Sequence, residues 1–240
     1  MSGNPRQWTP LAGKAYDRRR LGAIAARWDA RAEAWDRDLD DPACHLNEDD
    51  AYRRFLREID RVIERRRGFC ARHGVIDVGC GTGLVLAQVI SAFAWGVGVD
   101  ISEQMIRVAE EKRIRRARFI LGDCFGLPAV CPRAGAVLSR GVLLSHYGRR
   151  QGEQLLKASK AALVSGGFLV FDFLNEAGRK KHKHAPENKT YFTRNQACAM
   201  ARRAGFQRAF VLGEEDRRVL ILLAREDLPR GRAGAKRSAE

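Results

Sequence analysis

Three glycines alternate with other residues in the stretch VIDVGCGTGLVLA, directly after an apolar run that contains one acidic residue, Asp77. These glycines are Gly79, Gly81 and Gly83. Glycine permits positive φ and leaves the main chain bare, so a ligand can touch the backbone there. The dinucleotide fingerprint GxGxxG would need its third glycine where Leu84 stands. The spacing therefore argues against NAD(P) and for a different ligand, with an ordinary strand–helix turn as the alternative.

Two further acidic residues follow at the ends of later apolar runs. Asp100 ends the run GVGVD, and Asp123 follows the next run in ILGDCFGLP. A carboxylate at the tip of a buried strand is costly without a partner, which favours a ligand-binding role. For Asp100 the alternative is an N-cap of the helix that starts at Ser102.

Short apolar runs, typical of strands buried on both faces, alternate with segments of helical period. The predicted strands are 75–78, 97–99, 119–121, 136–138 and 168–173, with helices at 83–93, 102–112 and 151–164. After them come a helix at 195–203 and two strands at 209–212 and 219–224, with a turn between these strands at 216–218. This order predicts an α/β chain with a doubly wound, mostly parallel seven-stranded sheet and helices on both faces. Such sheets bind ligands beyond the carboxyl ends of their strands, where the glycine turn lies.

The order and spacing of Asp77, the three glycines, Asp100 and Asp123 are similar to those of S-adenosylmethionine-dependent methyltransferases of the Rossmann-like class. The resemblance covers about residues 25–225. It implies S-adenosylmethionine as the methyl donor and S-adenosylhomocysteine as the product. It also implies that Asp100 accepts hydrogen bonds from both ribose hydroxyls, and that Asp123 and the N–H after it bind the adenine. Phe125 or Ile101 would stack on the purine.

The segment ARWDARAEAWD resembles the WDxRAxxYD segment ahead of the core of many of these enzymes, with Trp35 in the place of the tyrosine. By that resemblance the N-terminal helix is a lid, Arg31 pairs with the cofactor's carboxylate and Trp28 lines the site. Guanidinium groups suit carboxylates, and aromatic faces attract a sulfonium cation. The alternative is a helix docked on the core by its two tryptophans. The periodicity predicts helices over 21–39 and 48–67, with a loop over 40–47.

The chain is thus predicted to have four parts: a flexible basic arm, an N-terminal helical lid, a Rossmann-like methyltransferase domain and a disordered basic tail. Their ranges are 1–20, 21–70, 71–227 and 228–240. The cofactor-binding set that the resemblance implies comes from the lid, the glycine turn and the strand ends. It comprises Trp28, Arg31, Trp35, Asp77, Gly79, Cys80, Gly81, Thr82, Gly83, Asp100, Ile101, Met105, Asp123, Cys124, Phe125 and Ser139.

The loop after the fourth predicted strand, SRGVLLSHYG, resembles the GNSxxHL segment of glycine and sarcosine N-methyltransferases, with Val142 in the place of the asparagine. The candidate catalytic residues there are Arg140, His146 and Tyr147. Arg140 either binds a substrate carboxylate or is solvated. His146 is a general base, a residue that positions the acceptor, or a structural histidine.

The composition of the chain limits the binding partners that we expect. The 240 residues carry a formal net charge of +15, and the basic cluster 113–118 and a predicted basic flap, 176–190, point towards nucleic acid. No nucleic-acid-binding module is recognisable, so a small-molecule acceptor is favoured over RNA, and cofactor binding without turnover stays open. Six cysteines without a CxxC pair predict free thiols and no metal site. Without a recognisable signal peptide or membrane span, we expect a cytoplasmic monomer or homodimer.

Overall fold

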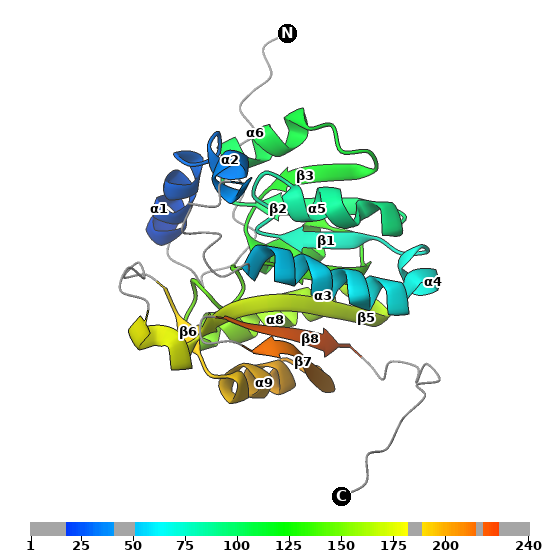
Figure 1. Cartoon of the computed structure of the whole chain (residues 1–240), viewed down its shortest axis with the longest axis vertical. Helices are drawn as coiled ribbons and strands as arrows, with labels where there is room; N and C mark the ends of the chain where they lie inside the picture. Colours follow the sequence, from blue (N-terminus) through cyan, green and yellow to red (C-terminus); the bar gives the residue numbers. More distant parts are fainter. Residues whose placement is uncertain (1–17, 41–50, 182–188, 215–217, 226–240) are drawn as a thin grey trace, which may run out of the picture.

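The computed structural model describes residues 18–40, 51–181, 189–214 and 218–225, and it contains one mixed sheet (Figure 1). Seven strands follow in the order β3-β2-β1-β4-β5-β8-β7. They are β1 (Val75–Val78), β2 (Gly96–Asp100), β3 (Ala117–Leu121), β4 (Ala134–Ser139), β5 (Leu163–Asn175), β7 (Arg208–Glu214) and β8 (Arg218–Ala224). Neighbours among β1 to β5 are parallel, whereas β8 is antiparallel to both β5 and β7. The predicted α/β fold is confirmed.

A further strand of two residues, β6 (Tyr191–Phe192), was not predicted. It pairs in parallel with Leu174 and Asn175 at the carboxyl end of β5, beyond the last β5 residue that pairs with β4. A run this short carries no periodicity, so only the tertiary pairing reveals it.

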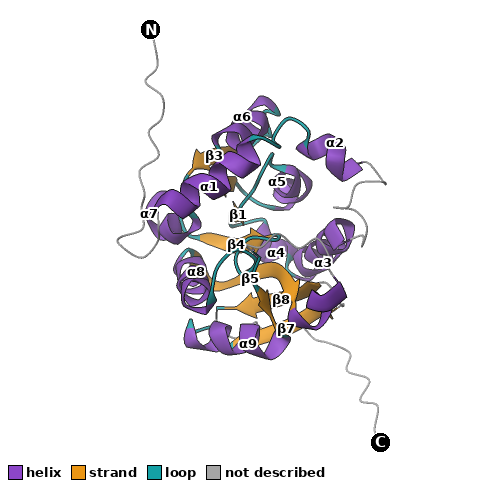
Figure 2. Cartoon of the chain, turned by 90° about the vertical axis from the view of Figure 1, so that its left-hand side faces the viewer, coloured by secondary structure: helices purple, strands orange, loops and turns teal. Residues whose placement is uncertain are grey.

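Helices cover both faces of the sheet, as Figure 2 shows. One face carries α3 (Ala51–Arg65), α4 (Arg67–Cys70), α5 (Leu84–Val89) and α6 (Glu103–Glu111), and the other carries α7 (Leu127–Val130), α8 (Arg149–Ala161) and α9 (Arg194–Arg203). Short 3-10 turns are η1 (Ile90–Ala92), η2 (Cys124–Gly126) and η3 (Glu176–Lys181). Ile76 of β1 packs in one core and its neighbour Val75 in the other, because successive strand residues point to opposite faces.

The single helix predicted over 21–39 is two helices, α1 (Arg18–Asp29) and α2 (Trp35–Asp40), joined by a turn. An unbroken helix would separate positions 28 and 35 by about 10 Å along its axis. The ring centroids of Trp28 and Trp35 instead lie 5.3 Å apart, edge to face. The turn thus folds the chain back so that the two rings meet, which helical periodicity cannot reveal. Figure 1 shows both helices beside the carboxyl ends of the parallel strands.

The predicted lid, residues 21–70, is not one unit. α3 packs on the sheet through Phe55 and Ile59, which are buried in the core, so α1 and α2 are the helices left over the strand ends. The predicted arm is also too long, since α1 begins at Arg18. The rest of that arm, the loop 40–47 beyond Asp40 and the tail 228–240 lie outside the described residues.

Other boundaries shift by a few residues. The predicted helix 151–164 ends at Ala161, and Leu163 already begins β5. Arg218, predicted in a turn, begins β8, and the other two residues of that turn lie outside the described ones. None of the helices in the described part of the chain has the length and hydropathy needed to cross a lipid bilayer.

Candidate active site

The glycine turn joins β1 to α5, and all three of its glycines have positive φ: 70°, 52° and 81° at Gly79, Gly81 and Gly83. A Cβ at Gly79 would lie 2.2 Å from the Val142 side chain, and one at Gly83 would lie 2.9 Å from Phe119. A Cβ at Gly81 would meet nothing closer than Trp35 Nε1, at 3.7 Å. Gly79 and Gly83 are therefore needed for packing, whereas Gly81 turns its bare side towards a pocket that it lines.

Two carboxylates from neighbouring strands line this pocket. Asp77 is 1% exposed, and its Oδ2 accepts no hydrogen bond from any described residue. Burial, reinforced by the charge of Asp100, raises the pKa of Asp77 to about 7. The carboxylate of Asp100 accepts hydrogen bonds from the backbone N–H groups of Gly81, at 2.8 Å, and Ser102, at 2.9 Å. Burial also raises the pKa of Asp100 above its ordinary value.

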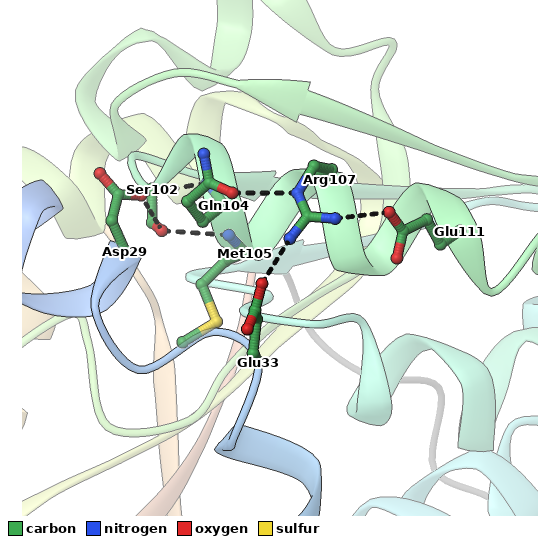
Figure 3. A network of polar contacts seen from close by, with 7 residues as sticks. All are labelled: Asp29, Glu33, Ser102, Gln104, Met105, Arg107 and Glu111. Carbon is green, nitrogen blue, oxygen red and sulfur yellow. Dashed lines mark hydrogen bonds and ion pairs between the residues drawn. The ribbon is translucent and has the colours of Figure 1, made fainter.

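The N-cap of α6 is Ser102, so Asp100 does not cap this helix. The Ser102 hydroxyl accepts from the N–H of Met105 at 3.1 Å. In Figure 3, Asp29 of α1 reaches the same helix end, where its Oδ1 accepts from the Ser102 hydroxyl at 2.6 Å and the Gln104 N–H at 3.0 Å. A carboxylate at a helix N-terminus is favourable, because it satisfies free N–H groups and complements the helix dipole. These bonds fasten α1 to the element that follows Asp100.

Two ion pairs in Figure 3 lie further along α6, where Arg107 bonds Glu111 at 2.7 Å and Glu33 of the turn after α1 at 3.3 Å. Both pairs are exposed, and exposed pairs contribute little to stability. Asp36 of α2 also accepts a hydrogen bond from the Thr82 hydroxyl. The turn after α1 is thus bound to α6, and α2 is bound to the glycine turn.

Asp123 caps the 3-10 turn η2. Its Oδ1 accepts from the N–H groups of Phe125, at 2.9 Å, and Gly126, at 3.1 Å, while its buried Oδ2 accepts no hydrogen bond from the described residues. Asp123 does not itself line the pocket, although its neighbours Gly122 and Cys124 do. The role of Asp123 in binding adenine therefore stays a prediction.

The candidate acceptor residues lie on the loop after β4, the strand next to β1. Arg140, His146 and Tyr147 all line the pocket. The His146 ring meets Trp28 edge to face, with centroids 6.3 Å apart, and its Nε2 lies 3.1 Å from Lys189 Nζ. The buried Tyr147 hydroxyl contacts Cys124 Sγ at 3.8 Å. This loop is thereby joined to α1 and to the segment before β6.

The structure brings most of the predicted residues into one pocket but leaves others outside its lining. Inside are Trp28, Trp35, Asp77, Gly79, Cys80, Gly81, Asp100, Ile101, Cys124, Arg140, His146 and Tyr147. Outside are Arg31, Thr82, Gly83, Met105, Asp123, Phe125 and Ser139.

The residues outside the lining have other contacts. The Arg31 guanidinium lies over the rings of Trp28, at 5.7 Å, and Trp35, at 5.4 Å. The Ser139 hydroxyl donates to the Val78 carbonyl at 3.0 Å and so joins β4 to β1. Met105 is buried, 2% exposed. Phe125 packs edge to face on Tyr147, with centroids 5.5 Å apart.

Sequence reasoning missed several lining residues. Some of these residues are apolar or glycine neighbours of predicted site residues. The others are Ile24, Tyr52, Val142, Lys189 and Arg218. Tyr52 begins the amphipathic helix α3, and Lys189 is one of several basic residues in the segment predicted as a flap. Neither position carries a local signal, because pocket contact depends on where the helix and the segment dock.

Comparisons with known proteins find a match to part of this chain. Residues 75–167 match the family model described as "Methyltransferase domain". Residues 75–167 are thus identified as a methyltransferase domain. The matched range of this methyltransferase domain includes the glycine turn, both pocket carboxylates and His146, whereas Lys189 and Arg218 lie beyond it.

Individual relatives of the methyltransferase domain are distant. The ubiquinone biosynthesis O-methyltransferase of Idiomarina loihiensis is 26% identical over 166 residues, which cover 65% of this chain and 59% of that protein. The chain therefore spans less than two thirds of the length of this curated relative.

Solved structures share the fold of the methyltransferase domain. The magnesium protoporphyrin IX methyltransferase of Synechocystis PCC 6803 with bound S-adenosylhomocysteine has a TM-score of 0.66 at 17% identity, covering 86% of this chain and 100% of that one. The same enzyme with S-adenosylmethionine has a TM-score of 0.65 at 18% identity, covering 90% and 100%. A methyltransferase of Clostridium acetobutylicum has a TM-score of 0.65 at 12% identity, covering 80% and 98%.

Replacing Asp77 by asparagine should stabilise the folded methyltransferase domain at alkaline pH and weaken binding of the cationic donor. Because the pKa of Asp77 is raised to about 7, the folded state keeps a proton that the unfolded state loses above about pH 4. The stability from this proton is fully present below pH 4 and is lost as the pH rises through 7. Asn carries no buried charge, so we expect the free energy of unfolding at pH 8 to rise by about 1 kcal/mol or more, and by less at pH 5.

Urea unfolding at the two pH values measures this change, and calorimetry measures binding. The loss of affinity should be larger for S-adenosylmethionine than for S-adenosylhomocysteine, because only the former carries the sulfonium charge. Asp60→Asn is the matched control. Partial desolvation also raises the pKa of Asp60, but this residue lies on the exposed face of α3 and does not line the pocket. Equal losses for both ligands, or a lower stability of Asp77→Asn at pH 8, would contradict the assignment.

Proposed function

We propose that this protein transfers the methyl group of S-adenosylmethionine to an oxygen or nitrogen atom of a small-molecule acceptor. The observation that carries the proposal is that one pocket contains the bare Gly81, the carboxylate of Asp77 with its unsatisfied Oδ2, and the imidazole of His146. The name of the curated relative, an O-methyltransferase, supports oxygen as the acceptor atom.

The residues present fit the donor. A buried carboxylate oxygen without a hydrogen-bond donor is costly, and the positive charges of the donor's sulfonium and ammonium groups would offset that cost at Oδ2 of Asp77. Asp100 uses one lone pair of each oxygen on a backbone N–H, and the remaining lone pairs suit the ribose hydroxyls. The free Oδ2 of Asp123 suits an adenine amino group. Trp28 and Trp35 supply aromatic faces that attract a cation.

The reaction needs little from the protein beyond the positioning of the donor and the acceptor. When bound, S-adenosylmethionine supplies a methyl group on a sulfonium, whose leaving group is already activated. The glycine turn and the acceptor loop orient the two reactants in line, and such orientation contributes up to roughly 7–11 kcal/mol. His146 positions the acceptor or takes its proton, which adds about 10²–10⁴-fold where a proton must leave. No catalytic triad is required.

The position of the N-terminal helices at the pocket supports a small-molecule acceptor. Ile24 and Trp28 of α1 and Tyr52 of α3 contribute to the pocket wall, so α1 would act as a lid over the bound molecules. The hydrogen bonds of Asp29 to α6 and of Asp36 to the glycine turn would hold this lid over the pocket.

Calorimetry tests the proposal first. Purified, folded protein should bind S-adenosylmethionine and S-adenosylhomocysteine, and a screen of phenols, amines and carboxylic acids should find acceptor-dependent release of S-adenosylhomocysteine. If neither ligand produces heat, the proposed function is wrong. If both bind and no acceptor in a broad metabolite mixture is methylated, the chain binds the cofactor without turnover.

Replacing His146 by alanine should lower kcat by at least tenfold with the best acceptor found, while leaving the dissociation constant of S-adenosylhomocysteine within about threefold. His146 lies on the acceptor loop and not on the glycine turn, so its loss should affect turnover more than cofactor binding. The control is His73→Ala, because His73 lies at the other end of β1 and bonds the Phe69 carbonyl at 2.8 Å. Full turnover in His146→Ala would remove the catalytic role.

A further inference from the structure

One part of the pocket is basic. Arg140 from the loop after β4, Lys189 from the segment before β6 and Arg218 from the start of β8 all line it, together with the glycine turn. Lys189 Nζ lies 3.1 Å from His146 Nε2 and 6.0 Å from the Trp28 ring centroid. The Arg140 guanidinium lies 5.3 Å from the Tyr52 ring. Three cationic side chains from distant parts of the chain thus meet in one cavity.

One member of this cluster, Arg218, is paired with an acidic side chain. Asp172 of β5 is the acidic group that pairs with Arg218, at 2.9 Å, and its other oxygen accepts from the Gly141 N–H. Burial, Arg218, Arg27 and Arg140 lower the pKa of Lys189 to about 7, against the opposite effect of Asp172. The charges around Lys189 are therefore mostly positive, and a bound anion would stabilise the charged lysine.

Resting on the methyltransferase function proposed above, we propose that Arg140, Lys189 and Arg218 bind an anionic group, a carboxylate or a phosphate, of the methyl acceptor. Guanidinium groups bind either anion through paired hydrogen bonds, and the lysine acts as a point charge. The pocket is then divided by charge, with Asp77 and Asp100 on the donor side and the three basic side chains on the acceptor side.

The donor also carries a carboxylate, which is the other anion that the cluster could meet. Although Arg218 begins β8, three strands away from β1, its guanidinium reaches back to within 3.6 Å of where a Cβ would lie at Gly141, on the loop after β4. Lys189 lies 3.1 Å from His146, the candidate acceptor-side residue, and this contact favours the acceptor's anion over the donor's. Competition between the probe anions and S-adenosylhomocysteine distinguishes the two.

The test uses protein saturated with S-adenosylhomocysteine and three aromatic probes: benzoate, phenyl phosphate and neutral benzamide. Aromatic probes suit the walls formed by Trp28, Tyr52 and Tyr147. At least one anion should bind tenfold or more tightly than benzamide, and comparing the two anions separates carboxylate from phosphate chemistry. Its affinity should fall as the pH rises from 6 to 9, because Lys189, facing Arg27, Arg140, Arg218, His146 and Asp172, loses its charge in this range.

Variants locate the anion. Lys189→Gln should weaken the anion at least tenfold with the affinity for S-adenosylhomocysteine unchanged, and Lys189→Arg should restore most of the loss. Lys157→Gln, an exposed lysine on α8, is the control and should bind as the wild type does.

Two results would overturn the inference while leaving the methyltransferase function intact. The first is that the complex with S-adenosylhomocysteine binds the anions no better than benzamide. The second is that the anions compete with S-adenosylhomocysteine and Lys189→Gln weakens that ligand instead, which would assign the cluster to the donor's carboxylate. Failure of the wild type to bind S-adenosylhomocysteine at all would overturn the proposed function and this inference with it.

Discussion

Gly81→Val should reduce the affinity for S-adenosylmethionine by more than about 100-fold while the protein remains folded. The valine side chain would project from the turn into the pocket, where the donor is expected to touch the main chain. The φ of 52° also strains a β-branched residue, which would shift the N–H that donates to Asp100 at 2.8 Å. Calorimetry measures the affinity, and the fluorescence of Trp28 and Trp35, which line the pocket, is a second measure of binding.

Gly166→Val is a control that separates the effect of filling the pocket from the effect of backbone strain. Gly166 has a φ of 71°, so valine is strained there too, and a Cβ would meet its nearest neighbour, the Phe69 ring, at 3.7 Å. It lies near the start of β5, at the opposite end of the sheet from the pocket. This control should lose stability, by about 1–2 kcal/mol or more, and keep its affinity for the cofactor. A Gly81→Val protein that binds within about threefold of the wild type would contradict the site.

Asp100→Ala should weaken cofactor binding by at least tenfold, the second large effect we expect. The substitution removes the proposed acceptor of the ribose hydroxyls and leaves the N–H groups of Gly81 and Ser102 without their partner. An unmade buried hydrogen bond costs about 1–3 kcal/mol, so the stability should fall as well.

A comparison of ligands shows whether the loss is direct. Against wild-type protein, an S-adenosylhomocysteine analogue without the two ribose hydroxyls should bind much more weakly than S-adenosylhomocysteine itself. Against Asp100→Ala the two ligands should bind almost equally, because the hydroxyls no longer have their acceptor. If the variant still discriminates between them as the wild type does, Asp100 acts only by holding the glycine turn.

Much of the donor side of the pocket was predictable from the sequence. Asp77, Gly81 and Asp100 all lie within or at the ends of short apolar runs, and parallel strands place their carboxyl ends at one edge of the sheet. The chemistry of the turn is therefore a local property of the chain. The predicted seven-stranded sheet follows from the same alternation of strands and helices, and the structure confirms it.

The acceptor side was predictable only in part. His146 was identified on its loop, but its neighbour Lys189 is 43 residues away along the chain. Arg218, which meets Asp172 across 46 residues, was assigned to a turn instead of to the start of a strand. The break between α1 and α2 was missed because the helical period continues across it, although Asp29 bonds to α6 there.

The sequence by itself determined the α/β sheet, the bare glycine turn and the two carboxylates beside it, because each depends on residues close together along the chain. The tertiary structure decided which distant side chains share the pocket: Tyr52, Lys189 and Arg218, and the ring pair of Trp28 and Trp35. It also decided that Arg31 and Asp123 lie outside the lining. Contacts between distant segments depend on how helices and loops dock on the sheet, and periodicity along the chain does not record that docking.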